Sequence, residues 1–210
     1  ARAAAAAKDV IDLDLYDLLI IEPESGTPDA DRPPLHPTYS TQDFPNGWQN
    51  VDPYASYKGN FDGTIQNSKN PELIFSRTYI GNTLTDFAKD CVPKSVSGNN
   101  KVAVTQKVVN AYYMNDGRTI EEALVTGYYP DVNNLTAADF TTSPSTFVPT
   151  EVCKIYANRE PRFYASIAFN GSIWECESAS EAQFRQQQIF YYRDTQNGKQ
   201  GFNEDCPLTG

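Results

Sequence analysis

Aromatic and amide side chains alternate along residues 44–66, a stretch interrupted by prolines. The members are Phe44, Asn46, Trp48, Gln49, Asn50, Asp52, Tyr54, Tyr57, Asn60 and Asp62. Neutral sugars present flat C–H faces that stack on aromatic rings, while their hydroxyl groups hydrogen-bond to amides and carboxylates. The pattern therefore predicts a carbohydrate-binding surface, with candidate ligand contacts at Trp48, Asn50, Asp52, Tyr54 and Tyr57. The alternative is that these aromatic residues pack the loop onto its scaffold.

Residues that could catalyse a reaction are few. The single histidine, His36, lies in a proline-rich loop, where no rigid scaffold holds it for a Ser-His-Asp triad. One histidine also excludes the histidine clusters and H-E-x-x-H motifs that bind zinc. The 27 acidic residues will place some carboxylate pair at the separation that glycosidases use, but no spacing selects one. A glycoside hydrolase therefore remains an alternative, and no catalytic residue is predicted.

Residues 194–205 superficially resemble a calcium-binding loop. An EF-hand needs glycine at the sixth position of its loop and glutamate at the twelfth. Counted from Asp194, Gly198 falls at the fifth position and Asp205 at the twelfth, so the register fails. A glycine-rich hairpin tip fits this segment better, and we predict neither a metal nor another cofactor.

The composition is that of an acidic globular chain. Its 210 residues suffice for one substantial domain or two small ones, and 40% of them are hydrophobic. The net charge of −10 argues against binding to nucleic acid and against docking on anionic lipid, because both need a basic patch. Neutral polymers such as glycans are compatible with this charge. No uninterrupted apolar run reaches the roughly 18 residues that a membrane-spanning helix needs.

The cysteines, Cys91, Cys153, Cys176 and Cys206, are widely spaced. They form no C-x-x-C motif, which argues against a zinc ribbon or a thioredoxin-like redox site. The sequence does not choose between the possible disulfide pairings, and buried free thiols are an equal alternative.

The elements that would hold these residues are short. An alanine-rich segment predicts a helix over residues 1–20, since alanine has the highest helix propensity. Residues 22–70 are rich in proline and predict a long loop. Short strands are predicted over residues 70–77 and 189–192, a short helix over residues 108–113, and a turn with positive φ at residues 115–117. Trp174 follows an apolar run and is expected to pack in the core.

Residues 156–171 hold the most specific pattern of the chain. Two arginines flank a proline, an apolar run follows, and an Asn-Gly pair closes the segment YANREPRFYASIAFNG. An Asn-Gly pair between apolar runs predicts a β-hairpin, because both residues tolerate positive φ. Arg159 and Arg162 either clamp an anionic ligand or pair with acids such as Glu160 and Asp116. We favour the second interpretation for both arginines.

This segment closely resembles the NRDPRFYATILYNG signature of the SusD/RagB family, the glycan-binding outer-membrane lipoproteins of Bacteroidetes. Three further blocks are similar to that family: AAKDVIDLDLYDLL near the start, NPELIFS after residue 69, and QKVVNAYYMNDGR before residue 119. Asp14 stands where the family commonly has glycine, so the helix end is expected to close differently. The structural signature residues are Asn158, Arg159, Pro161, Arg162, Phe163, Asp116 and Gly117.

The resemblance implies a fold class that is mainly α with irregular loops and small β-hairpins (α+β). The chain would be the C-terminal portion of a tetratricopeptide-like α-superhelical fold, with both ends cut from a longer protein. Residues 1–20 would form the last scaffold helix, with an exposed apolar face, and residues 21–210 the loop-rich C-terminal region. Residues 152–156 would end a long helix.

The resemblance also implies a function. It predicts non-catalytic binding of a glycan or oligosaccharide at the cell surface, for uptake through a SusC-like TonB-dependent transporter. It further implies an outer-membrane lipoprotein whose lipid anchor, on an N-terminal cysteine, precedes this sequence. The alternatives are a surface glycoside hydrolase and a family member that binds peptide. The sequence does not identify the glycan.

Overall fold

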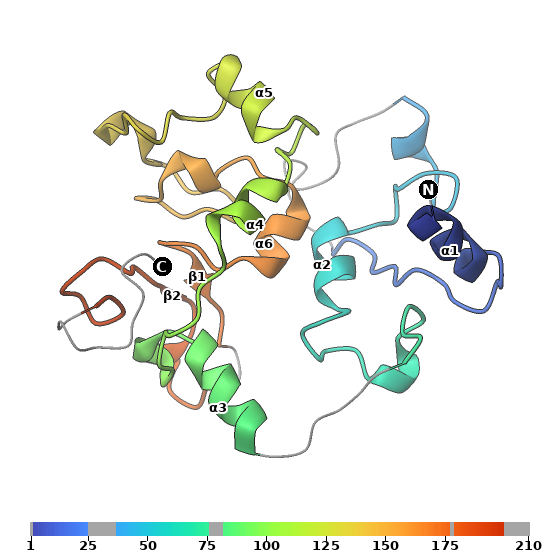
Figure 1. Ribbon diagram of the computed structural model, residues 1–210, viewed down its shortest axis with the longest axis horizontal. Coiled ribbons are helices and arrows are strands. Elements are labelled where there is room, and N and C mark those ends of the chain that lie inside the picture. The colour runs from blue at the N-terminus through green and yellow to red at the C-terminus, as the bar shows by residue number, and fades with distance from the viewer. Residues whose placement is uncertain (1, 25–36, 76–81, 177–178, 200–210) are drawn as a thin grey trace. The chain divides into compact units, whose positions relative to one another are not determined.

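The computed structural model describes residues 2–24, 37–75, 82–176 and 179–199. The chain divides into two compact units, residues 1–78 and residues 79–210. Figure 1 shows short helices joined by long irregular segments, with one two-stranded sheet in the described part of the chain. This arrangement confirms the predicted fold class, which is mainly α with irregular loops and few short strands.

The first unit begins with α1 (Arg2–Ile11), which the alanine run favours. No residue of α1 is buried, and Lys8 pairs with Asp12 one turn later (Nζ–Oδ1 2.6 Å). The helix predicted over residues 1–20 is therefore too long. Three residues after the end of α1, the main chain at Asp14 has a φ of 53°. Aspartate tolerates this left-handed conformation better than most residues. Asp14 occupies the position at which the family that this chain resembles commonly has glycine.

The apolar side chains at the end of α1 and beyond it lie on the surface. Ile11, Leu13, Leu15 and Leu18 are each more than half exposed. The exposed apolar face was expected on a helix, whereas Leu13, Leu15 and Leu18 lie beyond the end of α1. The packing of α1 against further scaffold helices stays a prediction, as does the domain boundary at residue 20.

A helix forms in the proline-rich region where only loop was predicted. This helix, α2 (Pro53–Lys58), starts with proline, whose fixed φ suits the first helical position and whose missing N–H is not needed there. Asp52 caps it, since Asp52 Oδ1 accepts a hydrogen bond from Ala55 N (2.8 Å). Two 3₁₀ turns, Tyr39–Thr41 and Asn67–Lys69, also lie in this unit.

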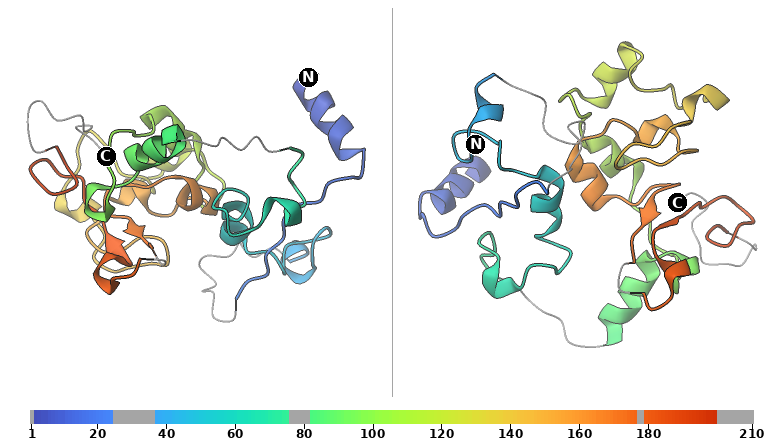
Figure 2. Two further views of the ribbon diagram at one scale, coloured as in Figure 1. Left: turned by 90° about the horizontal axis from the view of Figure 1, so that it is seen from below. Right: turned by 180° about the vertical axis from the view of Figure 1, so that it is seen from behind.

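The second unit contains α3 (Asn82–Cys91), α4 (Gln106–Ala111), α5 (Ile120–Val125) and α6 (Pro161–Ser166). Its 3₁₀ turns are Lys94–Val96, Ala137–Asp139, Lys154–Tyr156 and Ala182–Phe184. Strand β1 (Ile173–Trp174) pairs antiparallel with β2 (Gln187–Gln188), with Ile173 opposite Gln188 and Trp174 opposite Gln187. Figure 2 shows the short elements of this unit from two further sides.

Several local predictions are wrong. The strand predicted over residues 70–77 is absent from residues 70–75, which form turns, and residues 76 and 77 lie outside the described residues. Residues 189–192 form no strand, although one was predicted there. The strand in this region is β2, which consists of Gln187 and Gln188. Residues 152–156 do not end a long helix, because Cys153 forms a β-bridge with Phe140 and only a 3₁₀ turn follows. Trp174 is partly buried in β1 rather than part of the core. Contacts between distant segments override weak local preferences here.

The glycine turns form as predicted, but the hairpin does not. Helix α4 covers part of the predicted helix over residues 108–113, and Gly117 follows with a φ of 84°. Gly171 has a φ of 88°, and Ser172 N donates to Phe169 O across the turn (2.9 Å). The apolar run before this turn begins in α6 rather than in a strand, because Pro161 occupies the first helical position. The turn therefore joins the segment after α6 to β1.

Two hydrophobic clusters form the core of the second unit. The first contains Val109, Val148, Val152, Phe163, Ile167 and Phe169, with Tyr112, Phe147, Tyr156 and Tyr164 packed around them. The second contains Met114, Ile120, Ala123 and Tyr129. Phe163 is fully buried and meets Tyr112 edge to face, with ring centroids 5.7 Å apart. The signature residue Phe163 is thus architectural.

The two blocks of strongest family resemblance in this unit pair with each other. Asn115 N donates to Asn158 O (2.8 Å), and Glu160 N donates to Tyr113 O (3.1 Å). Between these bonds, Met114 forms a β-bridge with the residue after Asn158. Asn158 has a φ of 54°, which asparagine tolerates better than most residues. Residues 113–115 and 158–160 are therefore joined directly by main-chain hydrogen bonds.

Arg159 lies at this junction and is only 2% exposed. Its guanidinium donates to the carbonyl oxygens of Val109 (2.6 Å), Tyr112 (2.9 Å) and Ile155 (3.2 Å). The same group lies over the Phe163 ring, 4.6 Å from its centroid. Burial lowers the pKa of the guanidinium, because water no longer stabilises its charge. The predicted pairing of Arg159 with an acid is therefore wrong, since carbonyl oxygens accept its hydrogen bonds.

The other signature charges pair on the surface. Arg162 binds Glu160 as predicted (Nε–Oε2 2.7 Å). Asp116 binds Arg118 (Oδ2–Nε 2.8 Å), and this hydrogen bond is the main cause of a lowered pKa at Asp116. Both pairs agree with the favoured interpretation, in which these charges support the fold.

Free thiols are found at Cys91, Cys153 and Cys176, whereas Cys206 and His36 lie outside the described residues. The segment predicted to be a glycine-rich hairpin tip forms a turn near residue 194, where Asp194 N donates to Lys199 O (3.0 Å), but no pair of strands flanks this turn among the described residues. Within the described ranges, every helix is too short or too polar to cross a bilayer.

Candidate ligand-binding site

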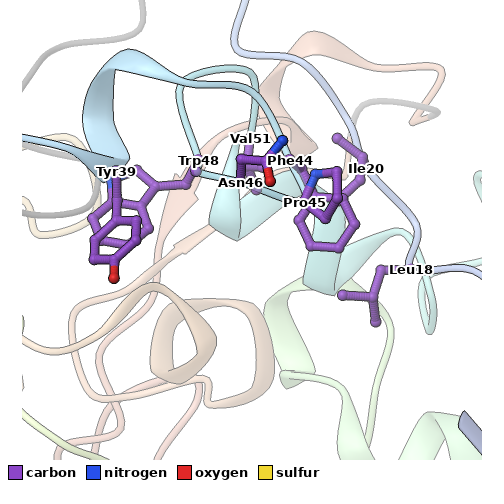
Figure 3. Close-up of a pocket in the computed structure, with 9 residues that line it drawn as sticks. Leu18, Ile20, Tyr39, Phe44, Pro45, Asn46, Trp48 and Val51 are labelled. Atoms are coloured by element: carbon purple, nitrogen blue, oxygen red, sulfur yellow. The ribbon is translucent and has the colours of Figure 1, made fainter.

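A hollow of about 420 Å³ opens on the first unit, between the segment at residues 18–20 and the loop at residues 39–51. This volume falls in the range of roughly 300–1,000 Å³ that is common for small-ligand sites. Figure 3 shows the Tyr39 and Trp48 rings together at one end, and Phe44, Pro45, Ile20 and Leu18 toward the other. The described lining residues are Leu18, Ile20, Tyr39, Phe44, Pro45, Asn46, Gly47, Trp48 and Val51.

Main-chain hydrogen bonds close the loop that carries the aromatic end. Trp48 N donates to Tyr39 O (2.8 Å), and Gln49 N donates to Gln42 O (2.9 Å). Gly47 lies where the two arms approach most closely. A Cβ atom at Gly47 would lie 2.3 Å from Tyr39 O and 2.4 Å from Gln42 O, which leaves no space for any side chain. Glycine at this position therefore permits the closure of the loop.

A turn at residues 43–47 holds the middle of the loop. Asn46 N and Gly47 N both donate to Asp43 O (3.0 Å each). Asn50 Oδ1 accepts a hydrogen bond from Phe44 N (2.9 Å), so the Asn50 side chain ties the two halves of the loop together. The Phe44–Pro45 peptide bond is cis. These contacts fix Phe44 and Asn46 beside the hollow.

Tyr39 and Trp48 form an aromatic platform. Their ring centroids are 5.2 Å apart and their planes are inclined by 34°. Tyr39 is 46% exposed and Trp48 is half-buried, so each ring is held by its neighbour while the pair remains accessible to a ligand. A pre-positioned pair of rings loses little conformational entropy when a flat ligand stacks on it.

The opposite wall comes from the extended segment 18–21, whose side chains alternate in direction. Leu18 and Ile20 line the hollow. Leu19 and Ile21 approach the end of α2, where a Cβ atom built on Gly59 would lie 3.2 Å from each of them. The main chain is anchored as well, since Ile21 O accepts a bond from Asp52 N (2.8 Å). Helix α2 therefore holds the segment that presents Leu18 and Ile20.

The structure brings together only part of the predicted ligand contacts. Trp48 lines the hollow, whereas Asn50 and Asp52 support it, Asn50 by tying the loop and Asp52 by capping α2. Tyr54 and Tyr57 are not among the lining residues. Tyr54 receives the Lys58 ammonium over its ring (5.3 Å), and Tyr57 contacts Phe61 (centroids 5.2 Å apart). A ligand-binding role for Tyr54 and Tyr57 stays a prediction.

Sequence reasoning missed Leu18, Ile20 and Tyr39. The first two had a signal, because Leu-Leu-Ile-Ile between Asp17 and Glu22 is a short apolar run, which is typical of an extended segment that packs against a neighbour. For Tyr39 there was no such signal, since nothing in the neighbouring sequence indicates that its ring contacts Trp48.

The hollow is neutral and mostly apolar. Among its described lining residues none carries a charge, and the polar side-chain groups that a ligand could reach are the Tyr39 hydroxyl and the Asn46 amide, since the Trp48 indole nitrogen is buried. Nor do the described residues contain a group of three or more His, Cys, Asp or Glu side chains that could hold a metal ion. This lining can stack on a ligand and hydrogen-bond to a few of its groups.

Comparison with models of known protein families places the chain in a family. Residues 42–209 match the model of the SusD family. The matched range includes Trp48 and the Arg159 junction but begins after Tyr39. No curated protein and no solved structure matches the chain significantly.

Proposed function

Because the chain belongs to the SusD family, whose members in general are non-catalytic nutrient-binding proteins, we propose that it binds a glycan without breaking a bond. The supporting observation is the half-exposed platform of Tyr39 and Trp48 beside a neutral hollow. A sugar ring would stack on the platform through its C–H face, and Asn46 would hydrogen-bond to a hydroxyl group.

We further propose that binding serves uptake. SusD family proteins in general work with SusC-like transporters at the outer membrane, so the partner here is a TonB-dependent transporter of that type. The full protein would be a lipoprotein exposed at the cell surface. Affinity purification of the natural protein from its native membrane should bring down such a transporter. Recovery of the protein without any transporter would contradict this part of the proposal.

Trp48→Ala tests the binding site. We expect glycan affinity to weaken by about 1–3 kcal/mol, by analogy with the loss when a base-stacking aromatic residue is removed. The measurement is calorimetry with a glycan identified on an array, alongside thermal unfolding of each variant. Tyr113→Ala is the control, because it removes an aromatic side chain that is 46% exposed and does not line the hollow. Tyr113→Ala should leave affinity unchanged.

Other outcomes of the same experiment separate the alternatives. Weakened binding in Tyr57→Ala as well as Trp48→Ala would extend the site to α2, as the sequence predicted. Unfolding of the Trp48→Ala variant would mean that the aromatic residues serve packing. Released sugars in a product assay would favour a glycoside hydrolase, and binding to peptides but no glycan would favour a peptide-binding family member.

A further inference from the structure

The hollow has few hydrogen-bonding groups for its size. Tyr39 and Asn46 carry polar side-chain atoms, the indole nitrogen of Trp48 is buried, and the remaining described lining is leucine, isoleucine, valine, phenylalanine, proline and glycine. A bare pyranose carries several hydroxyl groups. Each hydroxyl that is buried without a partner costs about 1–3 kcal/mol. The apolar end of the hollow is therefore poorly suited to an unsubstituted sugar.

The two ends of the hollow differ in character. Tyr39 and Trp48 form a flat aromatic surface at one end, and Leu18, Ile20 and Phe44 form an apolar wall toward the other (Figure 3). Leu18 is 56% exposed and Phe44 is 42% exposed, so both have apolar surface left to bury against a ligand. A ligand that matches both ends has a sugar ring and an apolar group attached to it.

We propose that the hollow binds a neutral glycan that carries an acyl or aryl substituent. The sugar ring stacks on Tyr39 and Trp48, and the substituent lies against Leu18, Ile20 and Phe44. This inference rests on the proposed glycan-binding function and narrows it to a ligand class.

Charge also restricts the ligand class. No charged side chain is among the described lining residues, and the chain carries a net charge of −10. A carboxylate or sulfate that entered the hollow would lose water without gaining a cationic partner. Uronic acids and sulfated sugars should therefore be excluded.

Matched glycosides test the proposal in the natural protein. Methyl and phenyl glycosides of glucose, galactose, mannose and xylose are titrated with detection by ligand-observed NMR, and phenyl glucuronide is compared with phenyl glucoside. For the sugars that bind, we expect the phenyl glycoside to bind at least about tenfold more tightly than its methyl counterpart. Phenyl glucuronide should bind at least about tenfold more weakly than phenyl glucoside.

Two variants assign the effect to the two ends of the hollow. Leu18→Asn should abolish the preference for the phenyl group, because it should lower the affinity for the phenyl glycoside at least about tenfold more than the affinity for the methyl glycoside. Because Leu18 is already largely exposed, this variant should fold normally. Trp48→Ala should weaken binding of both glycosides.

Each opposite result has a distinct meaning. Equal affinity for methyl and phenyl glycosides, with saturable binding, overturns the inference and leaves the proposed function intact. Tight binding of phenyl glucuronide overturns the neutral-ligand part. If phenol alone binds as tightly as phenyl glucoside, or if no glycoside and no arrayed glycan binds, the inference and the proposed function both fail.

Discussion

Arg159→Ala is expected to destabilise the protein by roughly 3–5 kcal/mol, because it leaves buried carbonyl oxygens without donors at about 1–3 kcal/mol each. The acceptors are Val109 O, Tyr112 O and Ile155 O, which belong to the end of α4, the residue after it, and the 3₁₀ turn Lys154–Tyr156. The guanidinium also fills space over the Phe163 ring. Chemical denaturation followed by circular dichroism measures the loss, which is a large fraction of a typical domain's stability.

Arg162→Ala is the matched control for this prediction. Arg162 lies three residues further along the same signature, but its side chain is 53% exposed and pairs with Glu160 at the surface. Glu160 is only 14% exposed, but its other carboxylate oxygen still accepts a hydrogen bond from Tyr113 N (2.9 Å) when Arg162 is removed, so we expect a loss of about 1 kcal/mol. Similar losses in the two variants would show that burial and the carbonyl contacts do not explain the effect of Arg159.

Gly47→Ala is expected to weaken glycan binding at least as much as Trp48→Ala does. A methyl group at Gly47 would overlap Tyr39 O and Gln42 O, so the loop would have to open at the bonds from Trp48 N and Gln49 N. Opening would separate Tyr39 from Trp48 and remove the platform. We expect the affinity to fall by about tenfold to a hundredfold, which corresponds to a loss of about 1.4–2.7 kcal/mol of binding free energy.

Gly63→Ala separates this effect from a general cost of replacing glycine. Gly63 belongs to the same unit, and a Cβ atom there would meet nothing within 4 Å, although its φ of 79° makes alanine unfavourable. Gly63→Ala should therefore cost some stability but retain glycan binding, as measured by the same calorimetric titration. Full affinity in Gly47→Ala would contradict the role given to the closed loop.

Local features of the sequence determined the short-range structure. The alanine run specified α1, Asn115-Asp116-Gly117 specified a turn with positive φ at Gly117, and Asn170-Gly171 specified another. Each depends on the conformational preference of a few adjacent residues, which no distant contact has to supply. The signature residues also identified the family, to which residues 42–209 belong. Trp48 was found among the candidate ligand contacts because aromatic residues alternate with amides around it.

The tertiary structure alone decided which distant residues meet. Nothing near Arg159 in the sequence indicates that its acceptors are Val109 O and Tyr112 O, and an acid partner was the natural expectation for a charged group. Tyr39 and Trp48 become a platform only when the loop between them closes, and Leu18 and Ile20 become its wall only because α2 holds their segment. Local propensity acts over a few residues, whereas burial and hydrogen-bond satisfaction depend on which segments pack together. For that reason the sequence indicated the chemistry of the site, and only the fold determined its members.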